Sequence, residues 1–148
     1  MNLYCPGVTN LPSPNHSDRR GADVRALVLH IEGGSDTATQ AWFTNPDSVA
    51  SAHFSVAKDG SSHQYVSCAD AAWANGIIDT IDHGHATAFL ASLPPTASPN
   101  RYSISIEHEG DSGDEMTAEQ FAESVRIAAW VFGPGGAMDG VQIGRAHV

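Results

Sequence analysis

The stretch RYSISIEHEG, residues 101–110, places two carboxylates and an imidazole next to one another, at Glu107, His108 and Glu109. Side chains alternate between the two faces of a β-strand. A strand here would therefore turn Glu107 and Glu109 with the serines to one face, and His108 with the isoleucines to the other. A polar, acidic face is typical of a reactive cleft wall, but an ordinary solvated sheet surface has the same pattern. The rest of the chain has to decide between the two interpretations.

Histidines are unusually frequent, with eight in 148 residues, which points to metal binding or acid–base chemistry. His30 stands at the end of the apolar stretch VRALVLHI. His53 lies in SAHFSV with parity opposite to its apolar neighbours, so it either lines a cleft or lies under the sheet. His83 and His85 form an HxH pair in a polar loop, where a solvated pair is favoured over a metal site.

The composition is that of a small globular enzyme or binding domain. At 148 residues, with 41% hydrophobic residues, the chain fits one domain, and no apolar run approaches the roughly 18 residues of a membrane span. The net charge of −10 without a Lys/Arg cluster argues against nucleic acid and anionic lipid as partners. Two cysteines without CxxC spacing favour free thiols over a single bridge. We expect a monomer.

The first half of the chain is expected to begin as an extended arm over residues 1–22, which is rich in proline. Residues 24–31 are apolar on both faces, which predicts a strand buried in the middle of a sheet. Ser35 is a candidate N-cap for a short helix that follows. Residues 52–66 alternate on both sides of Lys-Asp-Gly, which predicts a hairpin.

The second half begins with a long loop over residues 74–100, rich in Gly, Pro, Ser and Asn. After the strand at 102–109, Thr117 and Gln120 form a capping box that starts an amphipathic helix. Its predicted core face consists of Phe121, Val125, Ala128, Ala129 and Phe132. Without a repeat or a domain boundary, these elements predict a single α/β domain.

Four motifs in this order resemble the zinc-dependent N-acetylmuramoyl-L-alanine amidases, the family of phage endolysins and peptidoglycan recognition proteins. They are LVLHIEGGS, WFTNPDSVASAHFSVAKDGSSHQYV, DAAWANG and NRYSISIEHEG, which together cover most of residues 24–132. SAHFSVAKDG and SISIEHEG look most like phage lysin catalytic domains. The resemblance implies a mixed central sheet flanked by helices, with a zinc cleft at the sheet edge. It also implies a hydrolase that cleaves the bond between N-acetylmuramic acid and L-alanine in peptidoglycan.

The resemblance also assigns candidate site residues. His30 matches the first zinc ligand, and Glu107 matches the carboxylate beside the zinc-bound water, which would act as general base and then as general acid. Trp73 matches a tryptophan near the substrate, although Ala74 stands where the commoner family form has a histidine. His53 is a further candidate substrate contact. These roles would make the acidic face of the strand a cleft wall.

The tail of the sequence decides whether a zinc site can be completed, because a catalytic zinc needs three protein ligands. The family supplies the other two after the last helix, and His147 is the candidate for the second. However, IGRAHV is also encoded by one frame of a common sequencing adapter. We therefore hypothesise a read-through artefact at 143–148 on a truncated fragment, and place the catalytic domain at 23–142.

Two expectations concern the setting of the protein. The start of the sequence lacks a basic region followed by an apolar stretch, so a secretory signal is not expected. An endolysin-like protein would be made in the cytoplasm and act on the cell wall after release. The alternative function is a non-catalytic peptidoglycan-binding module on the same fold.

Overall fold

A five-stranded mixed sheet forms the centre of the protein, in a computed structural model that describes residues 3–76, 88–94 and 96–139. The strands in sheet order are β1 (Thr9–Asn10), β5 (Ser62–Gln64), β4 (Phe54–Val56), β7 (Ser103–His108) and β3 (Ala26–Ile31). The pair of β4 with β5 is antiparallel, while β1–β5, β4–β7 and β7–β3 are parallel. A two-stranded antiparallel ribbon of β2 (His16–Asp18) and β6 (Asp70–Ala72) lies beside the sheet.

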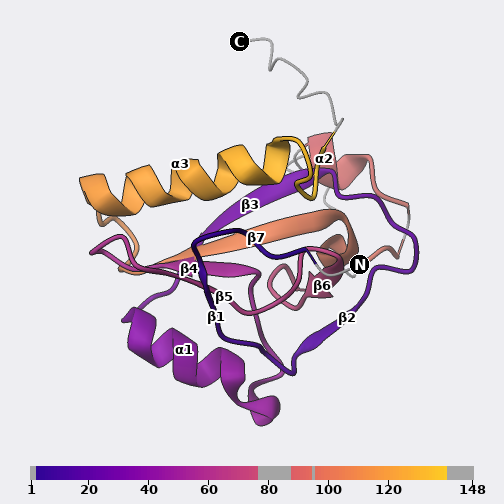
Figure 1. Cartoon of the computed structure of the whole chain (residues 1–148). Coiled ribbons are helices and arrows are strands. Elements are labelled where there is room, and N and C mark those ends of the chain that lie inside the picture. Colours follow the sequence, from indigo (N-terminus) through magenta and orange to yellow (C-terminus); the bar gives the residue numbers. More distant parts are fainter. Residues whose placement is uncertain (1–2, 77–87, 95, 140–148) are drawn as a thin grey trace.

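Two helices cover the two faces of this sheet (Figure 1). Helix α3 (Ala118–Phe132) lies across one face, and α1 (Asp36–Thr44) lies against the other, so we refer to the α3 face and the α1 face. Shorter turns occur in the connections, at η1 (Pro46–Ser48), α2 (Ala88–Ala91) and η2 (Pro99–Tyr102). The predicted fold, a single α/β domain with a mixed sheet between helices, is confirmed.

Two local predictions in the first half are also confirmed. The Ser35 hydroxyl accepts a hydrogen bond from the backbone N–H of Ala38 and caps α1, as its position before the helix predicts. Strands β4 and β5 form the predicted hairpin, whose turn contains Gly60 at φ +83°. A left-handed conformation of this kind favours glycine, which explains the residue type at this position.

The capping box is only half formed. The Thr117 hydroxyl accepts from the backbone N–H of Gln120 at 3.1 Å. The Gln120 side chain, however, does not reach back to the cap. Its amide donates to the carbonyls of Val56 (2.9 Å) and Glu109 (3.0 Å), so it ties the start of α3 to the ends of β4 and β7.

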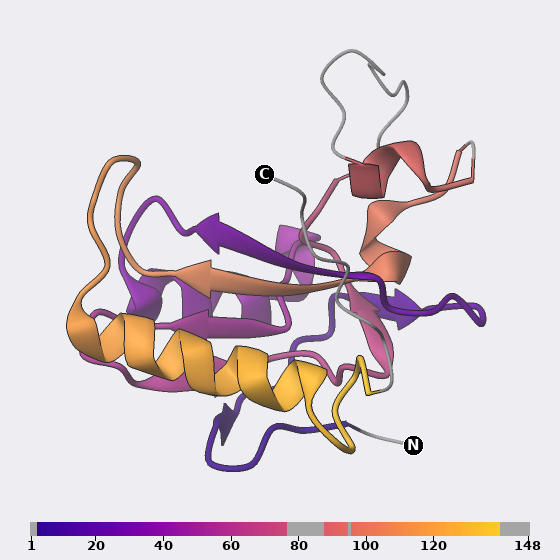
Figure 2. The ribbon, with the colours of Figure 1, turned by 90° about the horizontal axis from the view of Figure 1, so that it is seen from above.

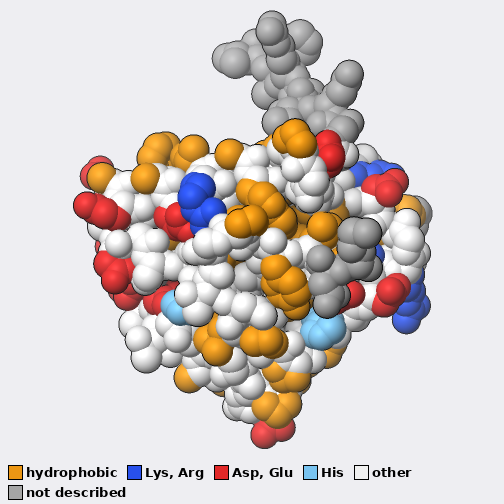
Figure 3. All heavy atoms as spheres, viewed as in Figure 1, with side chains coloured by type: hydrophobic (Ala, Val, Ile, Leu, Met, Phe, Trp, Pro, Cys, Tyr) orange, Lys and Arg blue, Asp and Glu red, His pale blue; other side chains and the backbone are white. Residues whose placement is uncertain are grey.

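The predicted core face of α3 is wrong by about one helical position. Phe121 and Val125 are 60% and 50% exposed, whereas Ile127 and Val131 are fully buried. Apolar side chains consequently appear along the outer surface of α3 in Figure 3. The prediction failed because two of the positions that face the sheet are polar, namely Gln120 and Ser124. Gln120 is buried by its bonds to Val56 and Glu109, and Ser124 bonds to His108 on the sheet.

The prediction of a central β3 is also wrong. Among the described residues β3 pairs with β7 alone, and Figure 2 shows it along the outer edge of the sheet. Leu29 and Ile31 on β3 are 57% and 50% exposed. The buried central strand is β7, where Ile104 and Ile106 are fully buried. An apolar run predicts a strand, but it carries no information on how many neighbours that strand has.

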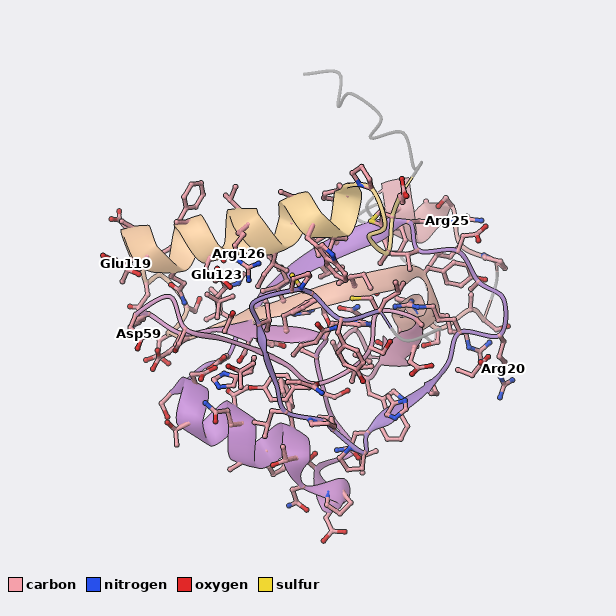
Figure 4. All side chains as sticks on the ribbon, in the orientation of Figure 1. Arg20, Arg25, Asp59, Glu119, Glu123 and Arg126 are labelled. Carbon is pink, nitrogen blue, oxygen red and sulfur yellow. The ribbon has the colours of Figure 1, made fainter. Side chains whose placement is uncertain are left out.

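The N-terminal arm is held to the domain by side chains. The backbone N–H of Cys5 donates to the Gln64 side chain at 2.8 Å. Arg126 on α3 donates to the carbonyl of Pro6 and pairs with Glu123 at 2.6 Å, and the two charged side chains lie together beneath α3 in Figure 4.

Both cysteines are buried free thiols, as predicted. No helix in the described ranges is both long and apolar enough to span a membrane.

The orientation of α3 predicts that two substitutions on this helix differ in their effect on the free energy of unfolding. Ile127→Ala removes a fully buried side chain and should lower the free energy of unfolding by about 2–4 kcal/mol. Phe121→Ala truncates a mostly exposed ring and should change it by less than about 1 kcal/mol. Urea unfolding of both variants measures this. A larger loss in Phe121→Ala would contradict the orientation.

Candidate active site

His30 and Glu107 are direct neighbours across the parallel pair of β3 and β7. Adjacent strands lie about 4.8 Å apart, and register partners point to the same face. This is the α1 face, because Ser55, the partner of Glu107 on its other side, donates to Asp36 of α1 at 2.5 Å. The sheet therefore brings together the two residues to which the sequence assigned the metal and the proton transfer.

Glu107 lies in the wall of a cleft of about 420 Å³ between α1 and the ends of β3 and β7. The cleft wall also includes Glu32, the loop that leads into α1 and one side of that helix. The prediction that Glu107 faces a cleft is therefore confirmed by the geometry. The rest of the polar face of β7 is not solvated, because Ser103 and Ser105 are buried and hydrogen-bonded.

Burial raises the pKa of Glu107, and the nearby imidazole of His30 lowers it in part. A carboxyl whose pKa is raised toward neutrality exchanges protons more readily at physiological pH than an exposed one. The cleft therefore holds a carboxyl suited to acid–base chemistry.

A second carboxyl in the same cleft, Glu32, was not predicted. Neither of its carboxylate oxygens is solvent-accessible or hydrogen-bonded among the described residues. Burial is the main cause that raises the pKa of Glu32 to about 8, and the nearby carboxylates of Asp36 and Glu107 add to the rise. The sequence did hold a signal, because Glu32 lies two positions after His30 and so on the same face of the chain.

His30 lies in the wall of a larger apolar hollow of about 680 Å³ along β3, whereas the next residue, Ile31, lines the cleft of Glu107. That hollow is lined by β3 itself, by the segment at Asn75, and by Phe89 and Pro99. The Nε2 atom of His30 lies 2.7 Å from Oδ1 of Asn75. The imidazole is thus fixed by a neighbour that the sequence did not indicate.

Trp73 lies in a third hollow, of about 390 Å³, together with Val49 and Arg101. Its indole N–H donates to the Ser17 hydroxyl at 3.3 Å. Gly76 lines both this hollow and the one beside His30, so the two are adjacent. The structure therefore places Trp73 near His30 along the surface but not in the cleft of Glu107.

His53 lies under the sheet rather than in a cleft. It is 1% exposed, its Nδ1 lies 3.1 Å from the Ser105 hydroxyl, and its Nε2 lies 3.0 Å from both the Asp70 carbonyl and the Arg19 guanidinium. Burial and the charge of Arg19 lower the pKa of His53 to about 3. Of the two placements that the sequence left open, the structure has the buried one, so substrate contact by His53 is not supported.

The neighbours of Glu107 have structural contacts. His108 bonds through Nδ1 to the carbonyl of His30 (3.0 Å) and through Nε2 to Ser124 (2.8 Å), as its parity predicted. Glu109 accepts from the backbone N–H of Lys58 at 2.8 Å. The predicted candidates His83, His85 and His147 lie outside the described residues.

The described residues supply one good metal donor, but they do not gather a group of three His, Cys, Asp or Glu side chains that could hold a metal. His30 fits such a role, because it stands on a hydrogen-bonded strand beside a carboxyl. A complete tetrahedral site would need further ligands from elsewhere in the protein.

The chain belongs to the N-acetylmuramoyl-L-alanine amidase family, whose sequence model matches residues 20–138. Its structure is similar to that of a selenomethionine derivative of AmpD, with 24% identity and a TM-score of 0.66 over 93% of this chain and 83% of AmpD. It is also similar to the endolysin amidase LysCS from Clostridium intestinale URNW, with 12% identity and a TM-score of 0.51 over 84% of this chain and 72% of that one. A mutant endolysin from Bacillus subtilis has 19% identity and a TM-score of 0.51 over 80% of this chain and 70% of that one. A search of curated proteins found no match.

Family membership makes the chain a peptidoglycan amidase, and nothing in the comparisons favours a non-catalytic binding module. The family is generally zinc-dependent. The solved structures, all below 25% identity, support the fold, in which a mixed sheet lies between two helices.

Because His53 is buried, we expect removal of its side chain to lower the stability of the fold. His53→Ala removes the bonds of the imidazole to Ser105, Asp70 and Arg19 and opens a cavity, so the free energy of unfolding should fall by about 2–4 kcal/mol. His16→Ala, at a largely exposed position, is the matched control. Equal stability of both variants in urea unfolding would contradict the structural role.

The raised pKa of Glu32 predicts that the stability of the fold depends on pH. Its pKa is about 8 in the folded state against an ordinary 4.5, so the folded state holds the extra proton and loses stability as the pH rises through that interval. Glu32→Gln should remove this part of the decline and be more stable than the wild type at about pH 8, by about 1 kcal/mol or more. Chemical denaturation across the interval measures it, with exposed Glu115→Gln as the control. Parallel curves for wild type and Glu32→Gln would contradict the buried carboxyl.

Proposed function

We propose that this amidase uses Glu107 to transfer protons and His30 to hold zinc when it cleaves the bond between N-acetylmuramic acid and L-alanine. The observation that supports this most is the direct pairing of His30 with Glu107, a residue that lies in the cleft wall. Catalysis of amide hydrolysis needs an activated water and a proton donor for the leaving nitrogen. One carboxyl beside one metal ligand is a minimal arrangement for activating the water and for protonating the leaving nitrogen.

His30 is proposed as one ligand of a zinc whose other ligands lie outside the described residues, with His147 as a candidate. When bound, zinc would polarise the scissile carbonyl and lower the pKa of a coordinated water. The imidazole is suited to this because β3 is paired with β7 and its ring is held by Asn75. A ligand that is already ordered loses little freedom when the metal binds.

Glu107 is proposed as both the base and the acid of the reaction. It would take a proton from the attacking water at a carboxylate oxygen and give it to the departing nitrogen of L-alanine. Partial burial supports this role because it raises the pKa of the carboxyl.

Trp73 is proposed as a substrate contact away from the bond that breaks. The hollow of Trp73 shares Gly76 with the one beside His30, and His30 pairs with Glu107, which lies in the cleft wall. Such a row suits a long substrate such as a glycan strand with its stem peptide. Its indole ring offers an apolar surface, and Arg101 in the same hollow offers a positive charge for a carboxylate.

The setting is proposed from the motifs that resemble phage lysins. We propose that the protein acts as a monomer on the bacterial cell wall after release from the cell in which it is made. The net charge of −10 agrees with a partner other than nucleic acid or anionic lipid.

If Glu107 transfers the protons, its replacement by glutamine should lower catalysis and leave zinc binding unchanged. In the full-length protein, Glu107→Gln keeps the shape of the side chain but removes its proton transfer, so kcat on a muramoyl peptide should fall about 10²–10⁴-fold. Zinc content and the unfolding midpoint should change little. Exposed Glu115→Gln is the control and should keep full activity. A Glu107→Gln variant with wild-type kcat would show that Glu107 is a surface carboxylate and not the acid–base group.

A further inference from the structure

Asn75 joins His30 to the interior of the protein through a directed chain of hydrogen bonds. From this chain we infer that Asn75 is a positioning residue that fixes the tautomer of His30. It holds the proton on Nε2 and leaves Nδ1 as the nitrogen that binds the metal. The inference deepens the proposed function, because it rests on His30 as a metal ligand.

The direction of the chain follows from the chemistry of its ends. The Ser103 hydroxyl lies 2.9 Å from the carbonyl oxygen of Pro99, which can only accept, so the hydroxyl donates there. Its single hydrogen is then used, and at its other contact Ser103 must accept. The Nδ2 group of Asn75, 2.6 Å away, is the donor.

This fixes the orientation of the Asn75 amide. With Nδ2 toward Ser103, Oδ1 points to His30, 2.7 Å from Nε2. An amide oxygen can only accept, so Nε2 carries the hydrogen. A neutral imidazole has one such hydrogen, and Nδ1 therefore presents its lone pair. Among the described residues, Nδ1 of His30 has no hydrogen-bond partner.

Further contacts hold the chain in place. The backbone N–H of Asn75 donates to the side-chain oxygen of Asn100 at 2.7 Å, which fixes the backbone from which the amide extends. On the other side, the carbonyl of His30 lies 3.0 Å from Nδ1 of His108. The backbone and the ring of His30 are thus held by different residues.

A fixed tautomer matters for metal binding because the metal needs an unprotonated nitrogen. Hydrogen bonds to the other ring nitrogen orient a ligating histidine, and their loss typically costs 10–100-fold in metal affinity. Asn75→Ala should therefore weaken zinc binding by this factor in the full-length protein. It should do so without removing any atom that touches the metal.

The test reads the tautomer directly in zinc-free protein. Nitrogen-15 NMR at about pH 8, where an ordinary histidine is neutral, distinguishes the protonated ring nitrogen from the unprotonated one. We expect Nε2–H in the wild type and in Asn75→Asp, whose carboxylate still accepts, and a mixture of tautomers in Asn75→Ala. Exposed Asn10→Ala is the control. A purely structural role for Asn75 would lower stability and leave the tautomer unchanged.

Zinc affinity, measured by competition with a coloured chelator, separates the two proposals. An unchanged tautomer in Asn75→Ala, or Nδ1–H in the wild type, would overturn the inference and leave the roles of His30 and Glu107 intact. Wild-type zinc affinity in His30→Ala would overturn both, since His30 would not be a ligand. The expected result is a shared tautomer for wild type and Asn75→Asp, with a 10–100-fold weaker affinity in Asn75→Ala.

Discussion

The parallel pairing of β3 with β7 is the constraint on which the rest of the site depends. It places His30 directly beside Glu107, although the two are far apart in the sequence. The pair is supported from both faces of the sheet. On the α3 face, His108 joins the carbonyl of His30 to Ser124 of α3, and on the α1 face, the side chain of Asn75 bonds both His30 and Ser103. A change in the register by one residue would turn one of the two functional side chains away from the cleft.

The α1 face is a buried polar layer, which is unusual for one side of a small sheet. Ser55 joins Asp36 to Tyr65, and the neighbouring His53 is held by Ser105 and Arg19. Polar groups in such a layer need defined partners, because an unpaired buried group costs free energy. The layer therefore gives the cleft rigid walls. Glu32, with no partner among the described residues, is the one carboxyl in it that departs from this rule.

The sequence predicted those features that depend on neighbouring residues along the chain. The alternation in residues 101–110 gave the correct faces of Glu107 and His108, and the N-cap at Ser35 was also correct. It did not predict the edge position of β3 or the inward face of α3, because both depend on contacts between distant elements. The contact of Asn75 with His30 is of the same kind: it requires a loop to fold back onto β3, and no local pattern of residues reports that.

The most direct test of this account is a double-mutant cycle on muramoyl-peptide hydrolysis by the full-length protein. It compares kcat/KM for His30→Ala, Glu107→Gln and the double variant. Residues that act in one catalytic unit give losses that do not add. The account predicts that the double variant is no slower than the slower single variant, within about threefold. Losses that multiply in full would show that His30 and Glu107 act independently, and would contradict a shared reaction centre.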